Sequence, residues 1–337
     1  MGTFPSLSRF AITRSIWYGR GMAGNHQRQR ISAHELASLA GRTLPSGVLS
    51  RMVGGVLAGL GVSLCMHRIS PKPRATDWQE GLSMAAEELD TLIELLLEGR
   101  PGHPSGWLSV TFDDGYRDAA EYIASRSKKY PDVEFIFFVC PQKSEERIGF
   151  RWDLIEETIK TGLPREQARP LMMATTNSYD LESSRPELKA LSSMPDYELA
   201  TLDELRALKT LPNVKLGNHT NLHLSAQLFP DEVVKTDFER STETFTRLFG
   251  PMREFAFPFG TPGFHFDQRH VAWLRALGNF SIWTTEARPY LLSERGPGAV
   301  LPRFPVNGSQ DAKSIAGWIA AKALQFRLQG TRHRFPY

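Results

Sequence analysis

The sequence predicts an α/β fold in which seven strands and the helices between them close into a barrel. Short apolar runs rich in β-branched and aromatic residues alternate with longer amphipathic stretches, and seven such runs occur along the chain. The length of 337 residues and the 41% hydrophobic content supply a core for one large domain or two ordinary ones. A closed or nearly closed barrel is therefore favoured over an open sheet.

The predicted strands share a short apolar, β-rich composition, and they are residues 62–67, 108–112, 133–139, 214–217, 254–258, 280–284 and 300–306. The predicted helices show apolar residues at roughly helical spacing, and they are residues 84–97, 117–129, 202–208, 231–248, 269–277 and 312–327. Strand and helix alternate in this order, which is the pattern of βα units around a parallel sheet.

Two regions lie outside the alternation. Residues 1–60 have no strong period and are predicted to form a loosely packed N-terminal arm, whereas residues 61–310 form the barrel and residues 311–337 a C-terminal helix and tail. An insertion at about residues 150–200 is too long for an ordinary connection, so we expect a lid over the barrel mouth. Trp152, near its start, is predicted to contact the substrate.

Charge and cysteine content exclude several classes of protein. The balance of 40 Lys and Arg against 37 Asp and Glu excludes a disordered acidic or basic chain. Nucleic-acid binding is not indicated, because the sequence has no basic stripe interleaved with aromatic residues. The two cysteines, Cys65 and Cys140, cannot build a disulfide framework. Both lie in apolar strand contexts, so they are interpreted as packing residues.

The N-terminal region carries no recognisable export signal. The first thirty residues contain five arginines and no acid, without the apolar core of a secretory signal. Between Arg51 and Arg68 the chain is uncharged, but the stretch is short for a spanning helix and contains four glycines. We expect a glycine-rich approach to a buried strand in a cytoplasmic protein. Membrane contact at the inner face is kept as an alternative.

Adjacent carboxylates, Asp113 and Asp114, follow the second predicted strand. Neighbouring acids at a strand end repel each other unless a cation or a proton is present, so stability alone gives little reason for the pair. A metal site explains it if one carboxylate coordinates the ion and the other stays free as a base. A surface Asp-Gly turn is the alternative for this pair taken alone.

His219 and His223 follow the fourth predicted strand. Histidines four residues apart face the same way on a helical turn, and this spacing suits two nitrogen ligands of Zn²⁺. An accidental pair on a helix face is the alternative.

Pro258, Phe259 and Gly260 end the fifth predicted strand in a rigid turn. The turn stops the strand, and it also allows the backbone N–H of Phe259 to face a developing oxyanion.

These groups are all expected at one face of the barrel. Asp113, His219, Pro258 and Arg303 each lie at or just past the C-terminal end of a different predicted strand, as does His67. In a parallel barrel these ends form the face where active sites are built. Two histidines and carboxylates meeting there predict a three-ligand Zn²⁺ site with an open position, which is typical of catalytic rather than structural zinc.

The motifs TFDDG at 111–115, HTxxH at 219–223 and FAFPFG at 255–260 resemble the metal-dependent polysaccharide deacetylase family, also called the NodB-homology or carbohydrate esterase 4 family. VSLCMHRI at 62–69 and LPRFPV at 301–306 are similar to the first and last strands of one branch, which has an FAYPYG-type turn. The resemblance spans about residues 62–306. It implies a deformed (β/α)7 barrel.

The resemblance also implies roles for individual residues. Asp114, His219 and His223 would bind Zn²⁺ or another divalent metal, and Asp113 would be the general base. The Phe259 backbone N–H, in the turn with Pro258 and Gly260, would hold the oxyanion. The products would be acetate and a free amine on a sugar.

Three positions depart from the family pattern. Ala256 stands where an arginine often orients the base, Trp283-Thr284-Thr285-Glu286 replaces an Asp-Trp pair, and no late histidine matches the one that protonates the leaving amine. We interpret His67 as its replacement, with His265 and His270 as weaker candidates. Arg303 is expected to contact Asp113 or an acidic substrate group.

The predicted substrate is an N-acetylated sugar, an oligosaccharide or a lipid-linked glycan intermediate, since a lid suits a small or lipid-linked substrate better than a long insoluble polymer. Two alternatives stay open. The same site could hydrolyse another amide, as a deformylase or deacylase does, or the chain could be a catalytically silent glycan-binding member. No nucleic acid is expected as a partner.

Overall fold

The computed structural model describes residues 41, 43–70, 83–99, 104, 106–162, 164, 166–167 and 185–329. Most of the predicted arm and part of the predicted insertion lie outside these residues. No helix in the described ranges is long and apolar enough to cross a lipid bilayer.

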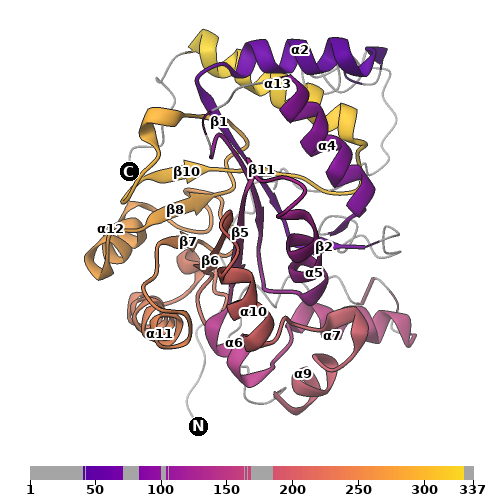
Figure 1. Ribbon diagram of the computed structural model, residues 1–337. Coiled ribbons are helices and arrows are strands. Elements are labelled where there is room, and N and C mark those ends of the chain that lie inside the picture. The colour runs from indigo at the N-terminus through magenta and orange to yellow at the C-terminus, as the bar shows by residue number, and fades with distance from the viewer. Residues whose placement is uncertain are drawn as a thin grey trace, which may run out of the picture.

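The centre of the fold is a sheet of parallel strands that curls back on itself (Figure 1). Its parallel strands are β1 (Leu60–Met66), β4 (Leu108–Phe112), β5 (Glu134–Val139), β6 (Val214–Asn218), β7 (Glu254–Ala256), β8 (Ser281–Thr284), β10 (Val300–Pro302) and β11 (Phe304–Pro305). Their order is β10-β8-β7-β6-β5-β4-β1-β11, and β9 (Tyr290–Leu291) pairs antiparallel with β1.

The two strands at opposite edges of the sheet, β10 and β11, follow each other in the chain. Only Arg303 separates β10, which pairs with β8, from β11, which pairs with β1 through Leu64 and Phe304. The last stretch of sheet therefore bridges the two edges and nearly closes the barrel. The predicted deformed barrel is confirmed: each of the seven predicted strands overlaps a strand of the sheet, and the last covers both β10 and β11.

Helices cover the outside of the sheet (Figure 1). They are α2 (Ser46–Leu57), α4 (Ala86–Glu98), α5 (Arg117–Arg126), α10 (Leu202–Lys209), α11 (Asp231–Phe249), α12 (Gln268–Leu277) and α13 (Ala312–Gln329). Shorter elements complete the fold: β2 (Arg68–Ile69) with β3 (Ser83–Met84), α6 (Pro141–Glu146), α7 (Arg151–Lys160), α9 (Arg185–Leu191), and single turns at Pro195–Tyr197, Ala226–Leu228 and Leu292–Glu294.

Alternate residues of the strands supply two separate cores, as the two-residue period of a strand requires. In β5, Phe135 and Phe137 belong to the large cluster between sheet and helices. Ile136 and Phe138 belong to a smaller cluster with Trp283 and other residues on the opposite face, inside the barrel. The barrel interior is therefore packed with side chains, and the space for chemistry lies at its C-terminal rim.

Helix α2 corrects the predicted arm. Residues 46–57 do not pack loosely, because Leu49, Val53 and Leu57 are fully buried. The helix crosses α4 so closely that a Cβ on Gly54 would lie 1.7 Å from the carbonyl oxygen of Gly99. Gly54, which weakens helix propensity in the sequence, is thus needed for this close approach.

Candidate metal centre and catalytic site

Strand β4 delivers Asp113 and Asp114 to the C-terminal rim. The Asp113 amide donates to the Met66 carbonyl at 2.9 Å, so Asp113 continues the pairing of β4 with β1. Asp114 then turns away with φ of 74°, a left-handed conformation that L-residues rarely adopt. The change of direction sends the two neighbouring carboxylates to different partners. Both side chains are almost completely buried.

His219 and His223 lie in a loop after β6, not on the helical turn that their spacing suggested. Thr220 and His223 have φ of 64° and 54°, which excludes a helix there. The loop is fixed by its own hydrogen bonds, because Thr220 Oγ1 accepts the His223 amide at 3.0 Å and Asp237 Oδ1 accepts the amides of Asn221 and Leu222, each at 3.2 Å. The helical turn expected from the spacing is therefore wrong, and a loop brings the two histidines close to each other.

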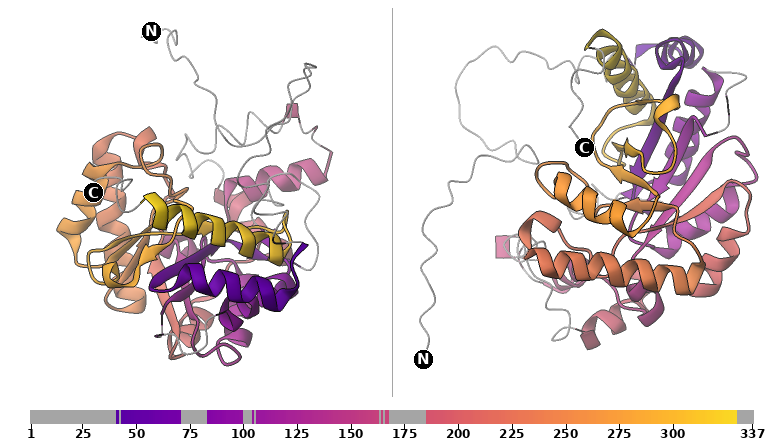
Figure 2. Two further views of the ribbon diagram at one scale, coloured as in Figure 1. Left: turned by 90° about the horizontal axis from the view of Figure 1, so that it is seen from above. Right: turned by 90° about the vertical axis from the view of Figure 1, so that its left-hand side faces the viewer.

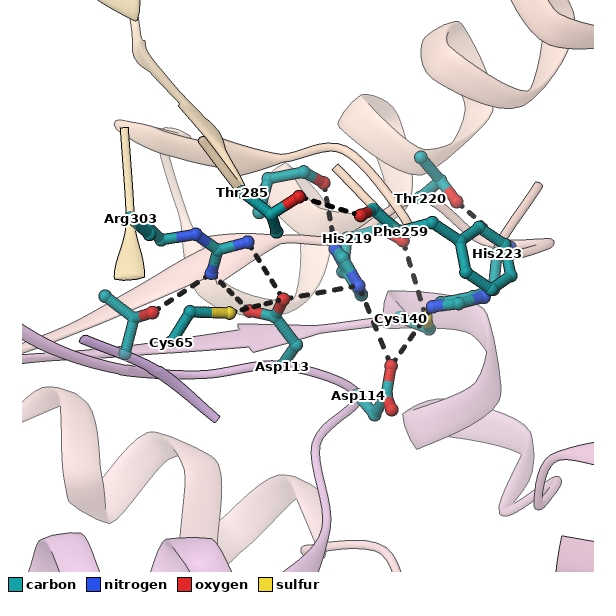
Figure 3. Close-up of polar contacts among 12 residues, drawn as sticks. Cys65, Asp113, Asp114, Cys140, His219, Thr220, His223, Phe259, Thr285 and Arg303 are labelled. Atoms are coloured by element: carbon teal, nitrogen blue, oxygen red, sulfur yellow. Dashed lines mark hydrogen bonds and ion pairs between the residues drawn. The ribbon is translucent and has the colours of Figure 1, made fainter. Parts of the chain in front are cut away.

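Asp114, His219 and His223 converge at one point (Figure 3). One ligand atom from each lies within 4.8 Å of the others. Asp114 Oδ1 is 3.1 Å from His223 Nε2 and 3.7 Å from His219 Nε2. Two imidazoles and one carboxylate are a donor set that fits a catalytic zinc site with three protein ligands.

The chemistry of these donors also fits a divalent metal. His219 Nδ1 is 2.8 Å from the Ala256 carbonyl oxygen, so Nδ1 carries the proton and Nε2 presents its lone pair to the cluster. Burial lowers the pKa of His219 to about 4, which keeps the ring neutral. Asp114 Oδ1 is buried and accepts no conventional hydrogen bond within the described residues. A cation would satisfy this oxygen.

Asp113 is held apart from this cluster by Arg303. Arg303 Nη1 and Nη2 donate to the two carboxylate oxygens at 2.6 and 2.9 Å, and both side chains are buried. Thr111 Oγ1 and the Thr284 carbonyl accept further hydrogen bonds from Arg303 at 3.0 and 3.3 Å. Burial raises the pKa of Asp113, but the adjacent Arg303 guanidinium outweighs it and leaves the pKa well below its ordinary value. Asp113 is therefore ionised.

The turn at Pro258, Phe259 and Gly260 faces the histidines. Phe259 has φ of 61°, and its ring centroid is 5.0 Å from that of His223. Thr285 Oγ1 donates to the Phe259 carbonyl at 3.0 Å, which fixes the peptide orientation. The Phe259 N–H makes no hydrogen bond within the part of the chain that the structure describes.

His67 and Trp152 also lie at this rim. His67 directly follows β1, whose last residue, Met66, pairs with Phe112 of β4, so His67 and Asp113 follow neighbouring strand ends. The Trp152 ring contacts the edge of His223 at 4.9 Å and stacks on Phe150 at 4.3 Å. The predicted insertion thus brings an aromatic side chain next to His223.

His265 and His270, the weaker candidates for the proton donor, lie in different environments in the structure. His270 is fully buried and accepts the Asp267 amide at 3.0 Å at the start of α12, which is a structural role. His265 accepts the Thr261 amide at 3.2 Å and lies 5.3 Å from the Phe259 ring, at the edge of the site.

Sequence reasoning missed Asp237, Tyr116 and Asp153. Tyr116 accepts from Trp152 Nε1 and donates to Asp153 Oδ2, both at 2.8 Å. Asp237 had a usable signal, because it lies three residues after Val234 and four before Ser241, on the buried face of the long helix α11. A carboxylate on an apolar helix face requires partners. Tyr116 and Asp153 had no comparable signal.

Comparison with known proteins agrees with this geometry. The sequence profile of the polysaccharide deacetylase family matches residues 102–279. The chain belongs to the polysaccharide deacetylase family. Membership supports an amide-hydrolysing deacetylase that acts on an acetylated polysaccharide, and Asp114, His219 and His223 form a possible metal site within the matched range.

Several solved structures are similar to this chain at low sequence identity. A candidate polysaccharide deacetylase of Bacillus anthracis is 12% identical, with a TM-score of 0.50 over 77% of this chain and 69% of that one. IcaB of Ammonifex degensii is 20% identical, with a TM-score of 0.47 over 78% of this chain and 97% of that one. A de-N-acetylase of Aggregatibacter actinomycetemcomitans is 13% identical, with a TM-score of 0.49 over 77% of this chain and all of that one. No curated protein sequence matches the chain.

Proposed function

We propose that this deacetylase removes an N-acetyl group from an N-acetylated sugar, an oligosaccharide or a lipid-linked glycan. One observation carries the proposal: Asp114, His219 and His223 converge, while the adjacent Asp113 is held away from them by Arg303. Two neighbouring carboxylates in different environments can take different roles, one as ligand and the other as base.

Asp114, His219 and His223 would hold Zn²⁺ or another divalent ion. Such an ion supplies Lewis acidity toward the acetyl carbonyl and makes a nearby water more acidic. The bond of His219 Nδ1 to the Ala256 carbonyl keeps its Nε2 free for this role. Left-handed backbone conformations at Asp114, Thr220 and His223 direct the candidate ligand side chains toward one another.

Asp113 would accept the proton of the attacking water. Its Oδ2 is 3.9 Å from His219 Nε2, so it borders the cluster without joining it. Arg303 would orient the carboxylate through two hydrogen bonds. It would take over the role of the arginine that the family often has at the position of Ala256. Phe259 N–H would donate to the oxygen of the former carbonyl. His67 would give a proton to the departing amine, and Trp152 would contact the sugar.

Paired variants test the separate roles of the two aspartates. Asp114→Asn should abolish both zinc binding and acetate release, because it removes a ligand charge. Asp113→Asn should keep zinc binding but lower the turnover rate about 10²–10⁴-fold, the usual contribution of a general base. His219→Gln should also lose zinc binding and acetate release. Its matched control is His270→Gln, at a buried histidine outside the cluster, which should retain both properties.

The measurements are zinc content by elemental analysis and acetate release from N-acetylated oligosaccharides. Formate release in place of acetate would assign a deformylase. Stoichiometric zinc without hydrolysis of any acylated sugar would overturn the proposal in favour of a silent glycan-binding protein. Full turnover by Asp113→Asn would remove the base assignment alone.

A further inference from the structure

The charge of this chain is strongly segregated along the sequence. Residues 1–76 contain ten Lys and Arg and one acid, Glu35, and residues 312–337 contain five Lys and Arg and no acid. The residues between them, 77–311, contain 25 Lys and Arg against 36 Asp and Glu. The net charge of +3 therefore conceals two basic ends and an acidic body.

The fold brings one helix from each of these two segments together, α2 from the first and α13 from the second. Helices α2 and α13 pack against each other and against α4, and they lie side by side at one end of the molecule (Figure 2, left). Arg327 of α13 donates to the carbonyls of Val56 and Ala58 at the end of α2, which fixes the two helices relative to each other. Neither helix contains an acidic residue.

The solvent face of this helix pair is also apolar. Among the described residues, seven large hydrophobic side chains are exposed, and four of them are on these two helices. Val48 and Met52 on α2 are 43% and 41% exposed, and Leu324 and Leu328 on α13 are 48% and 78% exposed. In each helix the two residues are four positions apart, so they project from one side of it.

Basic side chains accompany these apolar ones. Arg51 is exposed between Val48 and Met52, and Lys322 and Arg327 flank Leu324. A helix face of this kind, with exposed large hydrophobic residues among Lys and Arg and no acid, is typical of helices that lie in the interface of an anionic bilayer. The buried faces, with Leu49, Val53 and their neighbours, are already used by the fold.

We propose that the α2–α13 face docks on an anionic lipid bilayer, with Val48, Met52, Leu324 and Leu328 entering the headgroup region. The basic charge of both helices complements the anionic lipid, and the acidic remainder of the chain is repelled from it. The helices lie flat on the surface. The catalytic rim is formed by the ends of β4 and β6, so this contact surface is separate from the proposed reaction site.

Vesicle co-sedimentation of the full chain tests the proposal. Binding is expected to vesicles of phosphatidylcholine mixed with phosphatidylglycerol, to weaken with rising salt, and to be absent with phosphatidylcholine alone. Arg51→Gln combined with Lys322→Gln should reduce binding about fivefold per charge removed. The same net charge change at Lys128→Gln and Arg240→Gln, two exposed residues of the acidic body, should leave binding close to that of the unaltered protein.

A second pair tests the apolar contribution. Met52→Ser with Leu328→Ser should reduce binding at least tenfold, since each variant side chain loses the apolar area that would be buried in the interface. Leu228→Ser with Met194→Ser removes two exposed hydrophobic residues elsewhere and serves as the control. Unchanged thermal unfolding of the charge variants confirms that the fold is intact. Absent binding, binding that both pairs leave unchanged, or a dimer in size-exclusion chromatography that Met52→Ser with Leu328→Ser dissociates would overturn the proposal.

Discussion

At the scale of single residues, the most exacting feature is the buried pair of Arg303 and Asp113. Removing two charges from water is costly, and the cost is met only when each charge finds a partner and its remaining donors are satisfied. Here the guanidinium contacts both carboxylate oxygens, Thr111 and the Thr284 carbonyl, and it lies 5.2 Å from the Phe138 ring. Arg303 therefore fixes the orientation of Asp113 and also closes the sheet between β10 and β11.

Arg303→Met should lower the free energy of unfolding by about 3–5 kcal/mol, because it leaves a carboxylate buried without its partner. Arg303→Lys keeps the charge but loses the paired hydrogen bonds, so it should be destabilised less and still lose activity. Urea titration and acetate release measure the two effects. Equal activity of Arg303→Lys and the unaltered protein would show that Asp113 does not need this orientation.

A second residue-scale prediction concerns pH. Burial raises the pKa of Asp153 from its ordinary value near 3.8 to about 7. Between these values the folded state keeps a proton that the unfolded state releases, so the stability contributed by the neutral acid is full below about pH 4 and is lost as the pH rises toward 7. Asp153→Asn should remove this decline, on the order of 4 kcal/mol, from the pH profile of unfolding.

The matched control for this profile is Asp203→Asn, whose side chain is 94% exposed. It should retain the slope of the unaltered protein between pH 4 and 7. Asparagine at position 153 keeps an acceptor for the Tyr116 hydroxyl, so an altered slope would come from the lost titration. An unchanged slope in Asp153→Asn would contradict the raised pKa.

At the scale of elements, the loop after β6 depends on helix α11. Asp237 accepts two loop amides, and Asn218 both accepts the Thr220 amide at 2.9 Å and donates to Ser241 of α11 at 3.1 Å. These bonds hold the left-handed residues Thr220 and His223 in place. The helix therefore positions a proposed metal ligand without contacting the ion itself.

Asp237→Ala should weaken zinc affinity about 10–100-fold, the usual effect of losing a group that orients a ligand. The buried Asn221 amide, left without its acceptor, should also cost about 1–3 kcal/mol in stability. Competition with a chromogenic chelator measures the affinity. Asp237→Asn keeps one acceptor oxygen and should lie between Asp237→Ala and the unaltered protein. Unchanged zinc affinity in a folded Asp237→Ala protein would remove the positioning role.

The sequence predicted elements that have a local pattern and missed those that need a distant partner. The seven strands and the clustering of Asp114, His219 and His223 followed from alternation and from strand ends. Helix α2 did not, because its Gly54 is explained only by the close approach of Gly99, which directly follows α4. The loop conformation of His223 was equally hidden, since a spacing of four fits a helical turn and this loop alike.

At the scale of the whole molecule, the proposed ion would join parts of the sheet that β5 separates. Asp114 follows β4, and both histidines follow β6, with β5 between these strands in the sheet.

A ligand that binds only the folded state stabilises it by about 2.7 kcal/mol at one hundred times its dissociation constant. Zinc should therefore raise the unfolding midpoint by roughly 5 °C over the chelator-treated protein in differential scanning calorimetry. His223→Gln should abolish this shift and His270→Gln should keep it. If His223→Gln showed the full shift, the stabilising ion would be bound elsewhere, because Asp114 and His219 alone leave too few protein ligands to hold zinc as tightly.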